Sequence, residues 1–393
     1  MIFCDAYLPS YTSGGGMWTV VNLVERFSGR YEFFVVTRNY DIKGDRKVYA
    51  DVTTNEWNKV GKASVFYFSR WNLTERKLVG LVGDIQPTAI FLNSSLSTPT
   101  IKLLSARRKG SIGDLPVVLA PCGEMSIGAL SLKPYKKKLF LSYAKVVELY
   151  RGVIWKASFD LEKTEIRRVM GSDAEVWIAP DLTPKMILPD YTPKWKTPKK
   201  EGSVRFVFLS RLSRKKNIHY FLERLREITE GDVKFDIVGP LEDQSYWNSC
   251  LSIIEKLPSN VTVEATGAFR DQNDALRRVA ESHFFVLPTL NENFGYVFIE
   301  GLAAGCPVLT SDRTVWTDIE KKHSGWRVPL ENEKGWVDRI NLCIRMNERE
   351  YRNMSERARE YALNWLAQTE VEFANERVLQ RAVESRTRGM SNE

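Results

Sequence analysis

Two glutamates in the second half of the chain stand on either side of a short polar loop. Glu292 precedes the loop Asn293-Phe294-Gly295, and Glu300 follows Glu292 after seven intervening residues. We expect a strand to end near Pro288 and a helix to open near Gly295 and stop around Gly305-Cys306-Pro307, because Gly followed by Pro ends helices. Such a helix start can bind an anion, since its first amides lack intrahelical partners and Gly295 permits close approach. With Glu300 roughly 7.5 Å along the axis, the carboxylates could hold two parts of one elongated ligand.

A second candidate segment places four cations at the end of a strand. Arg211, Arg214, Lys215 and Lys216 follow the apolar run 206–209. Arginine binds phosphate with a fixed two-pronged geometry, lysine acts as a point charge, and negative charge that develops on a phosphate group is stabilised by such donors. A charge run is also typical of a solvated surface, and this interpretation is adopted for Arg214 and Lys215. Arg211 and Lys216 are the candidates for phosphate binding.

Two glycine-containing segments in the first half could also approach a ligand. Gly14-Gly15-Gly16 lies between the first strand and the first helix, where glycines let a ligand reach a helix start. A flexible loop is the alternative interpretation, and no Walker A lysine follows the run. Cys122-Gly123-Glu124 follows the strand Val117–Ala120. Glu124 is a candidate for ligand contact, whereas Cys122 also fits a plain buried residue.

The first of these segments resembles glycosyltransferase family 4. The resemblance rests on E-x7-E from Glu292 to Glu300, with Asn293-Phe294-Gly295 inside it and Ala-Gly-x-Pro-Val after it. It implies that Glu300 grips the ribose hydroxyls of a nucleotide sugar and that Glu292 contacts the donor sugar. The backbone of Asn293, Phe294 and Gly295 would then hold the diphosphate.

The other segments extend the resemblance over nearly the whole chain. The R-L-x-x-x-K pattern from Arg211 to Lys216 implies a diphosphate clamp. Gly15 and Gly16 match the ligand-binding glycine loop of the family's first domain, and Cys122 stands where the family often carries His or Arg. The resemblance implies that Cys122, Gly123 and Glu124 contact the acceptor. Weaker agreement comes from residues 157–162, 239–243 and 309–316.

The histidines limit the chemistry that the first half could perform. His219, His283 and His323 are the only histidines, and all lie in the second half. No histidine of the first half can therefore act as a base. The family transfers sugar with retention of configuration, and the leaving phosphate can take the acceptor proton. The resemblance thus implies a reaction that needs no protein base, no metal and no further cofactor.

The elements that would position these residues follow an alternating pattern. Continuous apolar runs alternate with helical stretches, which predicts βαβ units and parallel sheets. Prolines 180, 184, 189, 193 and 198 interrupt this alternation. The stretch Tyr351–Ala382 contains no Gly or Pro and is expected to be helix throughout. The resemblance implies the GT-B fold, with two Rossmann-like doubly wound domains facing a cleft. We expect an acceptor-binding domain over 1–185, a linker over 186–203 and a nucleotide-sugar domain over 204–364, with a C-terminal helix from about 365 to 393 crossing back to the first domain.

Composition and charge narrow the class of protein. The 393 residues are 43% hydrophobic and 27% charged, which is typical of a globular chain with a sizeable core. Five scattered cysteines lack metal or disulfide spacing, and neither a signal peptide nor an apolar window of about 20 residues is present. We therefore expect a cytoplasmic protein. The net charge of +8 would fit nucleic acid, anionic lipid or an anionic substrate, but no nucleic-acid-binding motif accompanies it, so no nucleic-acid partner is expected.

One helix could contact a membrane. Lys133 and Lys136-Lys137-Lys138 begin a predicted helix, Tyr135–Tyr150. Such a basic amphipathic helix could rest on anionic lipid at the inner face of a membrane. Alternatively, it packs its apolar side into the core and exposes only charge, which is the interpretation we favour. The apolar side consists of Leu139, Phe140, Leu141, Tyr143, Val146 and Val147.

The pattern as a whole predicts a retaining hexosyltransferase. Its donor would be a UDP- or GDP-linked sugar, and its acceptor a saccharide or lipid-linked saccharide of surface polysaccharide or lipopolysaccharide synthesis. The alternative is a catalytically inactive nucleotide-sugar-binding or scaffolding protein on the same fold.

Overall fold

The chain folds into two compact units. The computed structural model describes residues 1–10, 13–41, 47–131, 134–184, 196–269 and 272–390. Contacts group Met1–Pro184 with Thr369–Glu393 as unit 1, and Lys185–Gln368 as unit 2. Of the predicted linker, Pro189 and Pro193 lie outside the described residues, as does Lys133 of the basic helix. The described residues from Lys196 to Gln368 belong to unit 2.

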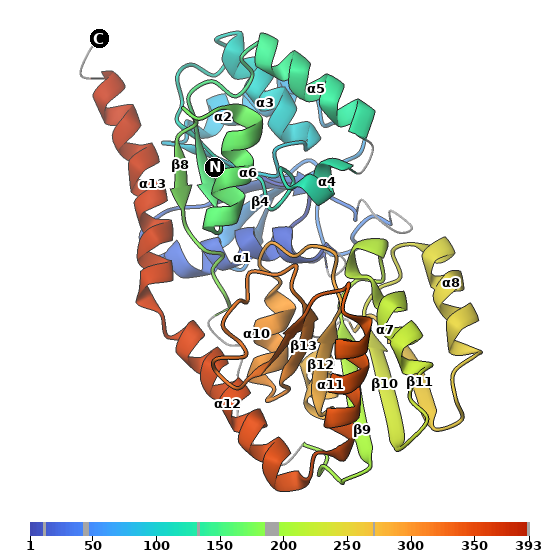
Figure 1. Cartoon of the computed structure of the whole chain (residues 1–393). Helices are drawn as coiled ribbons and strands as arrows, with labels where there is room; N and C mark the ends of the chain where they lie inside the picture. The colour runs from blue at the N-terminus through green and yellow to red at the C-terminus, as the bar shows by residue number, and fades with distance from the viewer. Residues whose placement is uncertain (11–12, 42–46, 132–133, 185–195, 270–271, 391–393) are drawn as a thin grey trace. The chain divides into compact units, whose positions relative to one another are not determined.

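Unit 1 is built on a mainly parallel sheet (Figure 1). Within the described residues its strands follow the order β3-β4-β2-β1-β5-β6-β7-β8, and only the edge strand β3 runs antiparallel to its neighbour. The order reverses direction at β1, which lies between β2 and β5. The strands are β1 Ile2–Phe3, β2 Phe34–Arg38, β3 Trp57–Val60, β4 Ala63–Phe68, β5 Ile90–Asn93, β6 Val117–Ala120, β7 Val153–Ala157 and β8 Val176–Ile178.

Helices cover both faces of this sheet, which explains why its strands are continuous apolar runs. Alternate residues of one strand enter different cores: Leu119 packs on one face, while Val118 packs on the other. Helices α2, α3, α5 and α6 contribute to the first core, and α1 and α13 to the second. These helices are α1 Gly15–Phe27, α2 Glu75–Ile85, α3 Thr98–Arg108, α5 Pro134–Val146, α6 Asp160–Met170 and α13 Thr369–Met390, with the short α4 at Ile127–Ser131.

Unit 2 contains a fully parallel sheet in its described part. The strand order is β11-β10-β9-β12-β13-β14, so the first strand of this unit, β9, lies beside its fourth, β12. This is the order of a Rossmann fold. The strands are β9 Ser203–Leu209, β10 Asp232–Val238, β11 Val261–Gly267, β12 Phe284–Leu287, β13 Val308–Ser311 and β14 Gly325–Val328.

Local signals set the helix ends of unit 2. Helix α10 begins after Gly295 and ends at Ala303, and Gly305 follows with a left-handed φ of 69°. The predicted start near Gly295 and stop near Gly305 are therefore confirmed. The helices of this unit are α7 Ile218–Leu225, α8 Gln244–Ile254, α9 Gln272–Ala280, α10 Tyr296–Ala303, α11 Glu333–Arg345 and α12 Glu348–Leu366, with a 3-10 turn η2 at Arg214–Lys216.

Two helix predictions were wrong in their extent. The helix expected over Tyr135–Tyr150 ends at Val146, because Glu148 adopts a left-handed φ of 48°. The stretch 351–382, expected as helix throughout, is divided between α12 and α13, which are separated by Ala367 and Gln368. No Gly or Pro marks this break. It coincides with the passage of the chain from unit 2 to unit 1.

Candidate functional site

The topology of unit 2 brings the two main candidate segments together. The sheet order reverses between β9 and β12, and open α/β sheets bind ligands at the carboxyl ends of the strands at such a reversal. Segment 211–216 follows β9, and segment 289–295 follows β12. The loops are joined directly, since Leu290 N donates to Lys215 O at 2.9 Å and Thr289 Oγ1 donates to the same oxygen at 3.1 Å.

Lys216 and Glu292 form an ion pair across these loops. Lys216 Nζ contacts Glu292 Oε2, and both side chains are almost wholly buried. Burial by itself would raise the pKa of Glu292, but the positive charges of Lys216, Lys215 and Arg211 outweigh it and lower the pKa. Glu292 is therefore a carboxylate at neutral pH. The site holds one buried negative and one buried positive group in contact.

Gly295 allows Glu292 to sit against the start of α10. Its φ is 75°, and a Cβ added here would lie 2.7 Å from Glu292 Cγ and 2.8 Å from Phe298 Cδ2. The neighbouring carbonyl of Phe294 accepts a hydrogen bond of 2.7 Å from Trp316 Nε1. Trp316 also packs against the Phe294 ring, with centroids 5.3 Å apart. The predictions did not assign this role to Trp316, although it lies in the weakly matching stretch 309–316.

Arg211 is positioned by a residue to which the predictions gave no role. Arg211 Nη1 lies 2.6 Å from Glu242 Oε2, in a partly buried pair. Glu242 follows β10, the strand on the other side of β9. Arg214, expected to be solvated, is largely exposed and lies 3.3 Å from Asp243. The sequence could have indicated Glu242, because it follows a predicted parallel strand. The carboxyl ends of neighbouring parallel strands lie at one edge of the sheet, so residues that follow them can meet.

Two further predicted features can be placed. Glu300 lies within α10 and is buried, with Ala304 N donating to its backbone oxygen at 3.0 Å. Its assignment to ribose binding stays a prediction. Asn217, directly after Lys216, has a φ of 59°. Asn tolerates this left-handed conformation better than most residues.

Asn93 connects two candidate segments of unit 1. Its Nδ2 donates to Gly16 O at 2.7 Å, and its Oδ1 accepts from Cys122 Sγ at 3.2 Å. Asn93 ends β5, which lies beside β1 where this sheet reverses. Gly15 begins α1, and Gly14 precedes it with a φ of 65°. The structure thus brings Gly16 and Cys122 close together through a side chain that the sequence analysis did not select.

The thiol of Cys122 is held in its protonated form. Burial raises its pKa well above the ordinary value, and the nearby carboxylates of Asp181 and Glu162 raise it further. Such a thiol is a poor nucleophile, because the thiolate is the reactive species. Cys122 therefore fits the interpretation of a small partly buried residue that donates to Asn93.

The remaining members of the Cys122 segment are engaged with the protein. Glu124 accepts hydrogen bonds from Ser94 Oγ at 2.6 Å, Ser95 N at 2.6 Å, Ser95 Oγ at 2.7 Å and Leu96 N at 3.1 Å. Its carboxylate thus fixes the turn after β5. Gly123 N donates to Glu162 Oε1 at 2.6 Å. Burial raises the pKa of Glu162, although bonds from the Ser158 and Gly123 amides oppose the shift.

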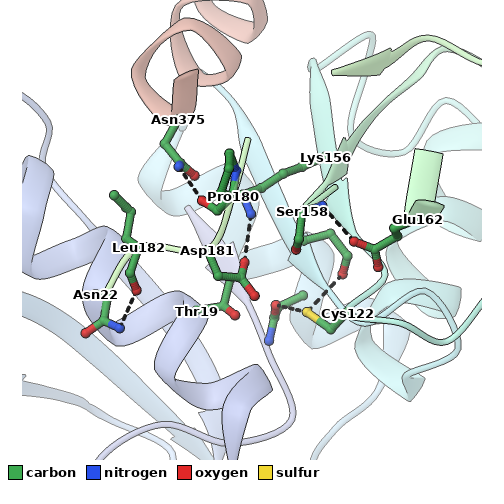
Figure 2. A network of polar contacts seen from close by, with 12 residues as sticks. Thr19, Asn22, Cys122, Lys156, Ser158, Glu162, Pro180, Asp181, Leu182 and Asn375 are labelled. Atoms are coloured by element: carbon green, nitrogen blue, oxygen red, sulfur yellow. Dashed lines mark hydrogen bonds and ion pairs between the residues drawn. The ribbon is translucent and has the colours of Figure 1, made fainter. Parts of the chain in front are cut away.

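A buried ion pair fixes the chain after β8. Lys156 Nζ lies 2.9 Å from Asp181 Oδ1, and both side chains are buried (Figure 2). Asn375 on α13 donates to Pro180 O at 2.7 Å, and Asn22 on α1 donates to Leu182 O at 2.6 Å. Segment 180–182 is therefore held from β7, α1 and α13 together.

The described part of the chain lacks both a cluster suited to a metal ion and a helix suited to cross a membrane. Those residues contain no cluster of three or more His, Cys, Asp or Glu side chains arranged to hold a metal ion. None of their helices is both long enough and apolar enough to cross a membrane. The expectations of a metal-free and cofactor-free reaction stay predictions.

Comparison with known families finds a match within the second unit. The family model described as Glycosyl transferases group 1 matches residues 192–361. The prediction of a transferase is thereby confirmed, whereas family 4 in particular and the retaining reaction stay predictions. The matched region contains Arg211, Lys216, Glu292 and Glu300.

A curated relative of this chain is also described as a glycosyltransferase. The chain is 23% identical over 226 residues to an Escherichia coli (strain K12) protein, WcaL, described as a colanic acid biosynthesis glycosyltransferase. The match covers 55% of this chain and half the length of that relative.

Solved structures support the predicted fold over nearly the whole chain. Sucrose-phosphate synthase from Thermosynechococcus elongatus has a TM-score of 0.72 at 16% identity, with 99% of this chain and 98% of that chain covered. Anabaena HepE in complex with UDP-glucose has a TM-score of 0.66 at 15% identity, with 97% and 98% covered. The predicted fold class, two Rossmann-like domains of the GT-B type, is confirmed.

Proposed function

We propose that this protein transfers a hexose, with retention of configuration, from a UDP- or GDP-sugar to a saccharide or lipid-linked saccharide acceptor. The observation that carries the proposal is the contact between Lys216 and Glu292 at the reversal of the unit 2 sheet, inside a glycosyl transferases group 1 domain. One charged group comes from each of two neighbouring strand ends. A donor with an anionic diphosphate and a polar sugar needs both kinds of partner.

The proposed reaction places increasing negative charge beside the cations. The bond from the sugar C1 to the β-phosphate oxygen breaks, the acceptor oxygen bonds to C1 on the same face, and its proton passes to the departing phosphate. Lys216 and Arg211 would stabilise the charge that develops on the diphosphate. Glu292 would hydrogen-bond the sugar hydroxyls.

The ion pairs give these cations defined positions before a donor binds. Glu292 lies in contact with Lys216 Nζ, and Glu242 holds the Arg211 guanidinium in one orientation. When a donor binds, we expect its phosphate oxygens to take over part of the contact with Lys216, which leaves Glu292 able to bind sugar.

The setting of the reaction is also part of the proposal. WcaL is described as acting in colanic acid biosynthesis, which supports a role in surface polysaccharide or lipopolysaccharide assembly. HepE binds UDP-glucose, which favours UDP-linked donors for the first assays. We propose a cytoplasmic protein that contacts the inner face of an anionic membrane to reach a lipid-linked acceptor.

The decisive experiment compares Glu292→Gln with the wild type. Thermal shifts with UDP, GDP and their sugar conjugates would first identify the donor, and hydrolysis or transfer of that donor would then be measured. We expect Glu292→Gln to lower kcat at least tenfold. The affinity for the free nucleotide should stay the same or increase, because Gln no longer competes with phosphate for Lys216. Glu255→Gln, on the exposed end of α8, is the control and should match the wild type.

A second variant tests the ribose assignment separately. Glu300→Ala should weaken nucleotide binding by roughly 1.5–3 kcal/mol, the usual range for lost hydrogen bonds to a charged group. Calorimetry with the free nucleotide measures this directly. An unchanged Kd in a folded Glu300→Ala variant would remove Glu300 from the ribose site.

The inactive binding protein is the alternative that these assays distinguish. If nucleotide sugars bind the wild type but it neither hydrolyses nor transfers them, the protein is a nucleotide-sugar-binding or scaffolding protein. Equal and measurable turnover in wild type and Glu292→Gln would instead contradict the role of Glu292. If no nucleotide shifts the melting temperature, the proposed function is wrong.

A further inference from the structure

Helix α5 of unit 1 presents apolar side chains on two different sides. Leu141 and Ala144 are buried in the core beneath the helix, and Phe140 and Val147 are partly buried against it. This side accounts for the packing of α5 on unit 1. The interpretation of an ordinary core helix predicts that the remaining exposed positions are polar or charged.

The exposed positions do not follow that expectation. Tyr135, Leu139, Tyr143 and Val146 are 88%, 75%, 60% and 83% exposed. At 3.6 residues per turn these four side chains fall within about 80° of the helix circumference and lie roughly opposite the buried side. They form a continuous outward stripe, hereafter the α5 stripe. Just before the helix, Ile127 on α4 is a further exposed apolar residue.

The charged side chains of α5 itself are all positive. The sequence contains no Asp or Glu between Glu124 and Glu148. Lys136 borders the stripe on one side, and Lys138 and Lys145 border it on the other; all three are exposed. Lys137 instead donates to Ala129 O at 2.5 Å and ties α5 to α4. Exposed lysines thus flank the stripe on both sides, whereas Lys137 stabilises the contact between α5 and α4.

We propose that the α5 stripe is the surface by which unit 1 inserts into the interface of an anionic lipid bilayer. The stripe would enter the region between the headgroups and the acyl chains, as amphipathic helices that lie in a membrane plane do. Lys136, Lys138 and Lys145 would extend toward anionic headgroups while their stems cover the apolar margin. Tyr135 and Tyr143 are of the residue type that gathers at membrane interfaces.

Charge and shape favour lipid over a protein partner on this face. A protein interface usually surrounds its apolar centre with polar residues of mixed kind, whereas the α5 stripe is bordered by lysines and lacks any acid to pair with a second copy of itself. Two copies placed stripe to stripe would bring their lysines together. An anionic bilayer offers both the apolar interior and the opposite charge. This inference rests on the membrane contact in the proposed function and identifies the face that makes it.

The test uses the full-length protein and vesicles without donor or acceptor, so its outcome is independent of the transfer reaction. Co-sedimentation with phosphatidylcholine vesicles is compared with vesicles that contain phosphatidylglycerol as well. We expect the wild type to bind only the anionic vesicles. Leu139→Gln/Val146→Gln removes apolar surface without changing charge and should weaken binding at least tenfold. Lys136→Gln/Lys138→Gln/Lys145→Gln should also weaken it and reduce its dependence on salt.

Matched controls separate this surface from general effects. Leu363→Gln removes an exposed leucine of α12, and Lys256→Gln/Lys321→Gln/Lys322→Gln removes three exposed lysines of unit 2. Both controls should bind anionic vesicles within twofold of the wild type, and all variants should melt as the wild type does.

Three outcomes would overturn the inference. The first is that the wild type does not bind anionic vesicles. The second is that the unit 2 lysine control weakens binding as much as the α5 lysine variant, which would indicate general charge attraction. The third is that the wild type is a dimer by sedimentation and Leu139→Gln/Val146→Gln makes it a monomer without changing vesicle binding, in which case a second copy covers the stripe.

Discussion

Acidification should destabilise unit 2 through the buried histidine His283. Its Nδ1 accepts the backbone N–H of Arg205 at 2.9 Å, so the proton of the neutral ring lies on Nε2, which donates to Thr197 O at 3.1 Å. A second proton on Nδ1 would break the first bond and bury a charge. Burial, followed by the positive charges of Lys196 and Lys199, lowers the pKa of His283 to about 3.

The sign and size of the effect follow from linkage. The pKa of His283 is about 3 in the folded state and about 6.5 in the unfolded state, so the unfolded chain takes up the proton first as the pH falls. The stability that neutral His283 contributes is complete above pH ~6.5 and is lost progressively toward pH ~3. At pH ~5 the loss is about 2 kcal/mol, from roughly 1.4 kcal/mol per pH unit.

The assay compares His283→Asn and His283→Gln with the wild type. Asn Oδ1 can still accept from Arg205 N, and the Gln amide can reach toward Thr197 O, but neither side chain titrates. The free energy of unfolding of unit 2 is measured in urea at pH 7.5 and 5.0. Hydrogen-exchange labelling of peptides from β9 and β12 monitors the unfolding, so unit 1 does not contribute to the signal. Both variants should be less stable than the wild type at pH 7.5 and should lose about 2 kcal/mol less than it on acidification. Equal losses in all three proteins would refute the reasoning.

Three further perturbations test other parts of the structure. Gly295→Ala, at a φ of 75° and with its new Cβ 2.7 Å from Glu292 Cγ, should lower the free energy of unfolding by about 1–3 kcal/mol; a variant with the wild-type urea midpoint would contradict this. Lys156→Met leaves Asp181 buried without a counter-charge and should cost about 3–5 kcal/mol, most of which the double variant with Asp181→Leu should recover; a double variant as unstable as the single one argues against the ion pair. Cys122 should react with a thiol reagent at pH 8 only after denaturation, because its pKa is raised, and rapid labelling of the folded protein, read by peptide mapping, would disprove this.

The sequence by itself determined the local features of the site. The start of α10 at Gly295 and its stop before Gly305 depend on the φ angles and amide groups of a few adjacent residues. The run Phe206–Leu209 before Arg211 is likewise continuously apolar, as strands of a parallel sheet that is buried on both faces are. Such features can be predicted from the sequence because they depend on interactions between residues that are close together in the chain.

Only the tertiary structure decided which side chains meet. Lys216 and Glu292 are 76 residues apart and pair because β9 and β12 are neighbours in the sheet, and Asn93 joins Gly16 to Cys122 for the same kind of reason. The direction in which α5 faces was equally undetermined, because its apolar residues occupy two sides and periodicity does not say which side packs. The core of unit 1 takes Leu141 and leaves Leu139 exposed. Local sequence sets each element, whereas contacts between distant elements are decided by the packing of the sheet and its helices.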